Sequence, residues 1–214
     1  MQTTKSSREE ILYNVRLFLP EEKVERPRIP TFPRPGTSLK SEFELRLREA
    51  GGAAHDISNV TEARSKMDTL HPDVKVICSA APEIPGTRNV HNVRDPHELA
   101  DVDVGVVRAQ FGIAESGAVW LTQEDLGVDA LAFLSQHLIV LLDPGQIVSD
   151  MHEAYRRVQL NKTAFGCFMM GPSATADVEA TLVHGAQGAR SLNIFFLAPS
   201  QAPLSPVSKP TTTA

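Results

Sequence analysis

Residues 168–197 read FMMGPSATADVEATLVHGAQGARSLNIFFL, and this segment gives the clearest indication of the fold. Its pattern predicts a strand, a polar turn, a short helix, a glycine-rich turn and a second strand. Open α/β sheets gather their functional groups at such turns between a buried strand and a helix. The segment therefore predicts an α/β protein and marks the polar turn as a candidate site.

Apolar strands and amphipathic helices alternate through the residues before this segment. We expect strands at residues 53–57, 74–80, 118–122, 137–143 and, within the quoted segment, 191–197. We expect helices from the N-cap Ser38 to Ala50, over residues 61–70 after Ser58 or Asn59 as cap, and over residues 147–160. The run HLIVLLD at 137–143 is typical of a central strand covered on both faces. The alternation predicts an α/β sandwich with a mixed, largely parallel sheet.

Both ends of the chain differ in composition from its middle. An amphipathic helix is expected at Ser7–Leu19, followed by a connector with five prolines between Pro20 and Pro35. The helix either packs on its own core or serves as an arm for a partner or a second copy of the chain. Residues 199–214 are rich in Ser, Pro and Thr and are expected to be disordered. We therefore predict three parts, at residues 1–37, 38–198 and 199–214.

Composition narrows the class of protein. The 214 residues carry a formal net charge of -5, and Lys and Arg form no cluster that would suit a phosphate backbone, so nucleic acid is not an expected partner. Cys78 and Cys167 are far apart in apolar runs, so we expect both to be buried and reduced, with neither a disulfide nor a cysteine-held cluster. No apolar stretch reaches signal or membrane length, which predicts a cytoplasmic protein.

The polar turn after the strand at Phe168 has two interpretations. Ser173 or Thr175 could cap the expected helix, with Asp177 and Glu179 in its first turns, where the helix dipole favours negative charge. The free N–H groups of the same helix end could instead bind a ligand carboxylate. His184 is expected as a cation near the end of that helix rather than as a catalytic base.

A second polar turn lies at residues 112–117, which read GIAESG. Its flanking glycines allow close backbone approach or positive φ, and Glu115 is either a site acid or a solvated or ion-paired side chain on a tight hairpin. Glu124 and Asp125 are expected to be exposed loop charges. His91, His97 and His152 lack the spacing of metal ligands, so no metal site is predicted.

These two turns together resemble the LUD domain of the lactate utilisation protein C family. The resemblance covers residues 100–197 most specifically, and the residues that carry it include Gly112, Ile113, Ala114, Glu115, Ser116, Gly117, Gly171, Pro172, Ser173, Thr175, Ala176, Asp177, Glu179, Gly185, Gly188 and Arg190. It implies a three-layer α/β/α fold similar to ribose-phosphate isomerase, glucosamine-phosphate deaminase and coenzyme A transferase. It also implies a bacterial cytoplasmic role in oxidising L-lactate to pyruvate. Gln187 and Ala189 depart from the family pattern His-Gly-Pro.

The resemblance leads to a first functional hypothesis. The chain would be a non-redox accessory subunit of lactate utilisation that binds a small hydroxy- or keto-acid, or docks partners, between the two turns. It would bind no cofactor itself, and iron–sulfur clusters would reside on two partner proteins. The expected ligand-binding residues are Gly112, Glu115, Ser116, Gly117, Gly171, Ser173, Thr175, Asp177, Glu179, Gln187 and Arg190.

Two further hypotheses come from other classes of protein. The turn at Glu115 is similar to the Glu-x-Gly turn that carries the nucleophile of coenzyme A transferases, so the chain could be a free-standing enzyme of that kind, or one similar to sugar-phosphate isomerases. Alternatively, the helix at Ser7–Leu19 could make the chain a structural interaction module. A homo-oligomer is compatible with all three hypotheses.

Overall fold

The computed structural model describes residues 6–19, 25, 27–30, 38–159, 161–176 and 180–199. The chain divides into two compact units, Met1–Pro33 and Arg34–Ala214. The first unit contains helix α1 (Ser7–Leu17), which begins with a capping box between Ser6 and Glu9. Its apolar side chains, among them Ile11 and Leu17, are 62% and 61% exposed. Whether α1 serves as an arm for a partner or for a second copy of the chain stays a prediction.

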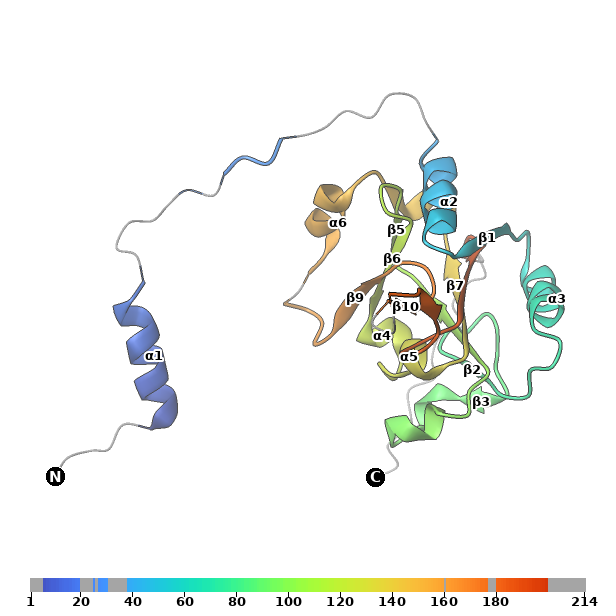
Figure 1. The fold of residues 1–214 in the computed structure, drawn as a ribbon, viewed down its shortest axis with the longest axis horizontal. Coiled ribbons are helices and arrows are strands. Elements are labelled where there is room, and N and C mark those ends of the chain that lie inside the picture. The colour runs from blue at the N-terminus through green and yellow to red at the C-terminus, as the bar shows by residue number, and fades with distance from the viewer. Residues whose placement is uncertain are drawn as a thin grey trace, which may run out of the picture. The chain divides into compact units, whose positions relative to one another are not determined.

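The centre of the second unit is a six-stranded sheet in the order β1-β12-β7-β4-β2-β3. All of its neighbouring strands are parallel. The strands are β1 (Ala53–Asp56), β2 (Ile77–Ser79), β3 (Arg88–Asn89), β4 (Val104–Arg108), β7 (His137–Leu142) and β12 (Ser191–Phe196). The predicted largely parallel sheet is confirmed, with the apolar runs β7 and β12 near its centre (Figure 1).

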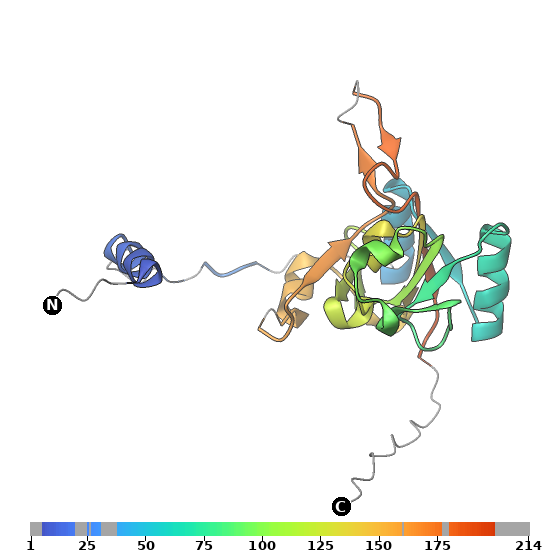
Figure 2. The ribbon, with the colours of Figure 1, turned by 90° about the horizontal axis from the view of Figure 1, so that it is seen from below.

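A second sheet of four strands has the order β8-β5-β6-β9. It contains β5 (Phe111–Ile113), β6 (Ala118–Thr122), β8 (Ile147–Val148) and β9 (Gly166–Met169). Its pairings are antiparallel except between β5 and β8. A separate two-stranded hairpin joins β10 (Ala174–Thr175) to β11 (Val183–His184). Figure 2 shows this hairpin, in orange, projecting away from the two sheets.

The helices of the second unit are α2 (Leu39–Glu49), α3 (Val60–Leu70), α4 (Gln123–Leu126), α5 (Leu131–Leu134) and α6 (Met151–Arg157). Side chains alternate between the two faces of a strand, so Val106 and Ile139 pack with the buried residues of α3 on one face of the central sheet. Leu138 and Val140 face the opposite side, where they pack with α2, α4, α5 and part of β6. The central sheet is therefore covered on both faces, as expected for an α/β sandwich.

The outer face of the second sheet forms a third, smaller core. Phe111, Ile113 and Trp120 pack there with Ala154 of α6. The second sheet thus lies between the central sheet and α6. Residues of its strands β6 and β9 also line two pockets of the second unit.

The structure corrects several expectations about local structure. The helix predicted after the Gly171 turn is wrong: Thr175 pairs with Val183 in the hairpin, so Ser173 and Thr175 cap no helix and His184 lies on a strand. The helix predicted at 147–160 is shortened to α6, because Ile147–Val148 pair with β5.

Two predictions about single side chains are also wrong. Asp125 is not an exposed loop charge: its Oδ2 accepts hydrogen bonds from the backbone N–H and the hydroxyl of Thr122 at 2.8 and 2.7 Å, which closes the N-terminus of α4. Cys78 is buried as predicted, but Cys167 is only partly buried. Within the described residues, no helix is long and apolar enough to span a bilayer.

Candidate functional site

A hollow lined by several kinds of polar side chain lies at the amino ends of β4, β7 and β12. It has a volume of about 530 Å³ and is lined by Leu70, His71, Pro72, Asp73, Val74, Asp103, Gln136, His137 and Arg190. We call it the histidine pocket. A concave site that brings together several polar groups and titratable side chains is the usual starting point for locating a binding site. This pocket lies at the edge of the sheet opposite the one where open α/β sheets usually bind ligands.

Two stacked histidine rings form one wall of the histidine pocket. His71 follows the last residue of α3, and its backbone N–H donates to the carbonyl of Met67, so the end of the helix fixes its position. His137 is the first residue of β7. The ring centroids are 4.1 Å apart and the planes are inclined by 26°. Nδ1 of His137 lies 2.8 Å from the hydroxyl of Ser191, whereas Nε2 of His71 is buried and has no partner among the described residues.

Burial keeps both rings neutral at physiological pH. Burial, together with a smaller contribution from charge on His137, lowers the pKa of His71 to about 4. Burial also lowers the pKa of His137, with a second contribution from the positive charge of Arg190 and a small opposing one from Asp103. A neutral imidazole both donates and accepts a hydrogen bond. The pair can therefore bind a hydroxyl or carbonyl group without adding charge.

Asp103 and Gln136 hold the pocket in place through the backbone. Oδ2 of Asp103 accepts the N–H groups of Lys75 and Val76 at 2.8 and 2.9 Å. These hydrogen bonds lower the pKa of the Asp103 carboxyl group. The carbonyl of Gln136 accepts the N–H of Arg190 at 2.8 Å. Asp103 is thus a structural anion whose hydrogen-bonding capacity is largely used by the backbone.

Arg190 supplies the positive charge of the pocket. It directly precedes β12, it is exposed, and it makes no ion pair with any residue that the structure describes. A guanidinium group presents planar donors that match a carboxylate. The pocket therefore brings one cation together with neutral hydrogen-bonding rings and the carboxylates of Asp73 and Asp103, and its arginine suits the carboxylate of a small organic acid with a hydroxyl or keto group. No cluster of three or more metal-binding side chains is found in the described part of the chain.

Among the predicted site residues, three line a different hollow. Gly171, Ser173 and Gln187 lie together in a pocket of about 310 Å³ whose other walls are mostly apolar, and we call it the turn pocket. The Ser173 N–H donates to the carbonyl of Ala189 at 2.9 Å, which holds the two glycine-rich segments together. Residues 187–189 line the turn pocket, and the next residue, Arg190, lines the histidine pocket.

The predicted turn at residues 112–117 is a tight hairpin that lines none of these hollows. Oε2 of Glu115 accepts the N–H of Met151 at 3.0 Å, at the start of α6. The Ser116 hydroxyl accepts the N–H of Ala118 at 3.4 Å. A Cβ on Gly112 would lie 2.9 Å from a side-chain methyl of Leu142, and one on Gly117 would lie 2.3 Å from the backbone N of Leu47 in α2. The glycines therefore allow the hairpin to approach its neighbours closely.

The remaining predicted site residues lie apart or outside the described part. Thr175 is on β10 in the projecting hairpin. Asp177 and Glu179 lie outside the described residues. The turns at Glu115 and Ser173 line no common pocket among the hollows described here; instead both pack against α2, through Gly117 at Leu47 and through Gly171 at Ala50.

Sequence reasoning predicted only Arg190 of the histidine pocket and missed its other polar residues, namely His71, Asp73, Asp103, Gln136 and His137. His71 was visible as a polar residue between a predicted helix and Pro72, and His137 as the first residue of the predicted central strand. Nothing in the linear sequence joins them, because they come from separate segments that meet through the parallel register of His137 with Val104 and Ser191.

The histidine pair should make the stability of the fold depend on pH. The pKa of His71 is about 4 in the folded chain against an ordinary value of 6.5, so the unfolded chain binds a proton more readily. The free energy of unfolding should therefore fall as the pH drops below 6.5 and stop falling from this cause below about 4. Urea unfolding across this range should show a shallower pH dependence for His71→Asn than for the wild type. Equal slopes would contradict the assignment of a buried, neutral His71.

A family model and several curated proteins are similar in sequence to this chain. Residues 92–197 match the LUD domain. The chain is 32% identical over 93 residues to the lactate utilization protein C of Halalkalibacterium halodurans, covering 40% of each chain. It is also 32% identical over 98 residues to the protein of the same name from Shouchella clausii, covering 42% of each. An uncharacterised protein of Neisseria meningitidis serogroup B is 31% identical over 104 residues, which cover 47% of this chain and 45% of that protein. The matches thus span less than half the length of these curated relatives.

A solved structure supports the fold independently. The crystal structure of a DUF162 family protein from Deinococcus radiodurans matches with a TM-score of 0.55 and 17% identity, covering 73% of this chain and 94% of that one. At this identity the likeness concerns the fold alone, and it agrees with the α/β architecture described above.

Proposed function

The chain belongs, through residues 92–197, to the LUD domain family, and on that premise we propose that it serves lactate utilisation as a subunit without a redox centre. Its part in that process is to bind a small hydroxy- or keto-acid and to work with iron–sulfur partner proteins in the cytoplasm. The observation that carries the proposal is the histidine pocket, in which Arg190, which forms no ion pair with the described residues, lies with two neutral histidines.

The pocket suits both ends of such an acid. Arg190 would bind the carboxylate through charge-assisted hydrogen bonds. The stacked, neutral rings of His71 and His137 would bind the hydroxyl or keto oxygen.

The cysteines favour partners as the site of electron transfer. Cys78 is buried, and burial raises the pKa of its thiol. Burial and the charge of Asp129 likewise raise the pKa of the Cys167 thiol. Since iron–sulfur clusters need several thiolates, we place any such cluster on partner proteins, with this subunit providing acid binding and assembly.

Affinity purification under anaerobic conditions from the native host tests the assembly part of this proposal. The tagged wild-type chain should recover two cysteine-rich iron–sulfur proteins. The Arg190→Gln variant should recover them equally well, because the substitution removes the acid site and leaves the rest of the surface unchanged. Recovery of the chain alone, with clusters kept intact throughout, would overturn the assembly proposal and leave acid binding to be judged separately by calorimetry.

A further inference from the structure

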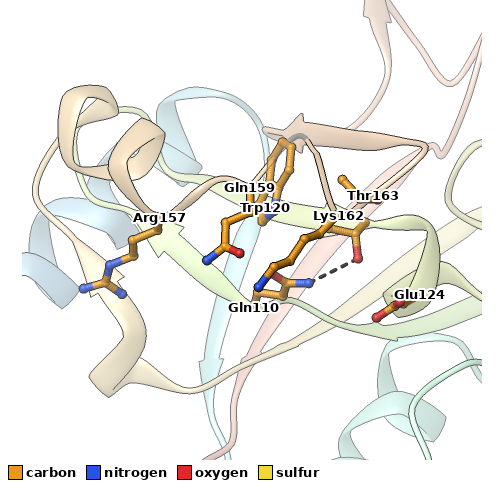
Figure 3. Close-up of a pocket in the computed structure, with 8 residues that line it drawn as sticks. Gln110, Trp120, Glu124, Arg157, Gln159, Lys162 and Thr163 are labelled. Atoms are coloured by element: carbon orange, nitrogen blue, oxygen red, sulfur yellow. Dashed lines mark hydrogen bonds between the residues drawn. The ribbon is translucent and has the colours of Figure 1, made fainter.

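A third hollow lies on the second sheet and plays no part in the proposed function. It has a volume of about 280 Å³ and is lined by Gln110, Trp120, Thr122, Glu124, Arg157, Gln159, Lys162 and Thr163 (Figure 3). We call it the tryptophan pocket. Its size is near the lower end of the range of ligand pockets, about 300–1,000 Å³, so it suits a small molecule.

The floor of this pocket is a rigid aromatic ring. Trp120 is only 4% exposed, and its ring lies 4.6 Å from that of Phe168 and 6.4 Å from that of Phe111. Strand β9 passes directly against the indole: a Cβ on Gly166 would lie 2.5 Å from Cη2 of Trp120. The indole is therefore fixed by its neighbours, and the small part of it that lines the pocket is apolar.

The two ends of the pocket carry opposite charges. Lys162 reaches across the pocket toward Gln110, while Glu124 lies on the other side (Figure 3). Neither Lys162 nor Glu124 forms an ion pair within the described residues. Arg157, by contrast, is held by Glu153 at 3.3 Å, and its guanidinium points away from the other lining side chains in Figure 3. One ammonium group and one carboxylate therefore remain to interact with a ligand.

A fixed amide lies between these two charges. Nε2 of Gln110 donates to the hydroxyl of Thr122 at 3.1 Å and to Oδ2 of Asp125 at 2.8 Å. The amide nitrogen has two hydrogens and both are used, so the carbonyl oxygen of Gln110 is the part left to accept a hydrogen bond. The Thr122 hydroxyl in turn donates to Asp125. The network orients Gln110 as an acceptor for a ligand N–H group.

We propose that the tryptophan pocket binds a small α-amino acid in its zwitterionic form. The ligand carboxylate binds the ammonium group of Lys162. The ligand ammonium group binds Glu124 and the Gln110 carbonyl. A multiply charged phosphate ligand fits less well, because a single available cation faces a carboxylate across the pocket.

The fluorescence of Trp120 provides a direct test, since it is the one tryptophan of the chain. L-alanine, L-lactate and propionate differ only in carrying an amino group, a hydroxyl group or neither. Titrated into the full-length protein, L-alanine should change the fluorescence saturably at micromolar to low millimolar concentrations. L-lactate should bind at least about tenfold more weakly at this site and propionate more weakly still, because each loses a charge-assisted hydrogen bond.

Two variants in the tryptophan pocket and one control variant outside it assign the fluorescence change to this pocket. Lys162→Gln should weaken L-alanine binding about tenfold or more, whereas Lys66→Gln on α3 should leave it unchanged. Glu124→Gln should reduce the preference for L-alanine over propionate. An absent fluorescence response, equal responses to the three acids, or a response unchanged in Lys162→Gln would each overturn the proposal. Because L-lactate binding at the histidine pocket is followed by calorimetry, failure here leaves the proposed function standing.

Discussion

Replacing Arg190 by glutamine should weaken the binding of L-lactate and pyruvate by tenfold to a hundredfold. Arg190 is the only Lys or Arg among the residues that line the histidine pocket. A hydrogen bond to a charged group contributes about 1.5–3 kcal/mol, which corresponds to this range of affinity. The histidines cannot replace the lost charge near neutral pH, because burial lowers both of their pKa values. Isothermal titration calorimetry at neutral pH measures the effect.

Two controls separate this effect from general changes of charge. Arg94→Gln removes an exposed arginine that lines none of the three pockets, and it should leave the affinity unchanged. His71→Asn should weaken the binding of L-lactate more than that of acetate, which has no hydroxyl or keto group for the histidine rings to bind. If Arg190→Gln bound both acids as tightly as the wild type, the histidine pocket would not be the acid site.

The central strands could be predicted because their local pattern and their surroundings agree. The run from His137 to Leu142 is apolar almost throughout, and the structure covers both of its faces. The helix α2 could be predicted for the same reason: its apolar face is buried, and Gly51, with φ of 84°, follows its end. In such elements the periodicity of the sequence and the tertiary contacts favour the same structure.

The wrong helix after Gly171 shows where this agreement fails. The residues Ser-Ala-Thr-Ala beginning at Ser173 include good capping residues and helix formers, so local preference favours a helix there. The structure instead pairs Ala174 and Thr175 with His184 and Val183. Likewise, Ile147 lies at helical spacing from Met151 and Ala154, but Ile147 and Val148 pair with β5 in the second sheet. Pairing with residues distant in sequence overrides a weak local preference.

The candidate site was harder to predict than the fold. Sequence motifs emphasised turns at the carboxyl ends of strands, but Arg190 is the one motif residue that lines the histidine pocket. The other polar groups precede strands or follow a helix, and only the sheet register brings them together. The chemistry of His71 depends on its burial, which no local pattern reveals.

The GIAESG hairpin leads to the second large expected effect, which concerns stability. Replacing Gly117 by alanine should reduce the free energy of unfolding by about 2–5 kcal/mol, because a positive φ costs about 1–2 kcal/mol and forced overpacking about 1–3 kcal/mol. The φ of Gly117 is 68°, and the added Cβ would lie 2.3 Å from the backbone N of Leu47 and 2.7 Å from its Cα. Backbone atoms of a helix cannot move aside as a side chain can. Urea unfolding monitored by circular dichroism measures the loss.

Gly127 provides a matched control, because its φ is also 68° but a Cβ there would meet only side-chain atoms of Val90, the nearest at 3.0 Å. Gly127→Ala should therefore show the cost of the positive φ with a smaller steric contribution, and it should destabilise the fold less than Gly117→Ala does. A larger loss for Gly117→Ala would identify the glycine of this motif as the residue that allows the hairpin to pack on α2. Equal losses would mean that α2 accommodates the methyl group, and the motif glycine would then need an explanation other than close packing.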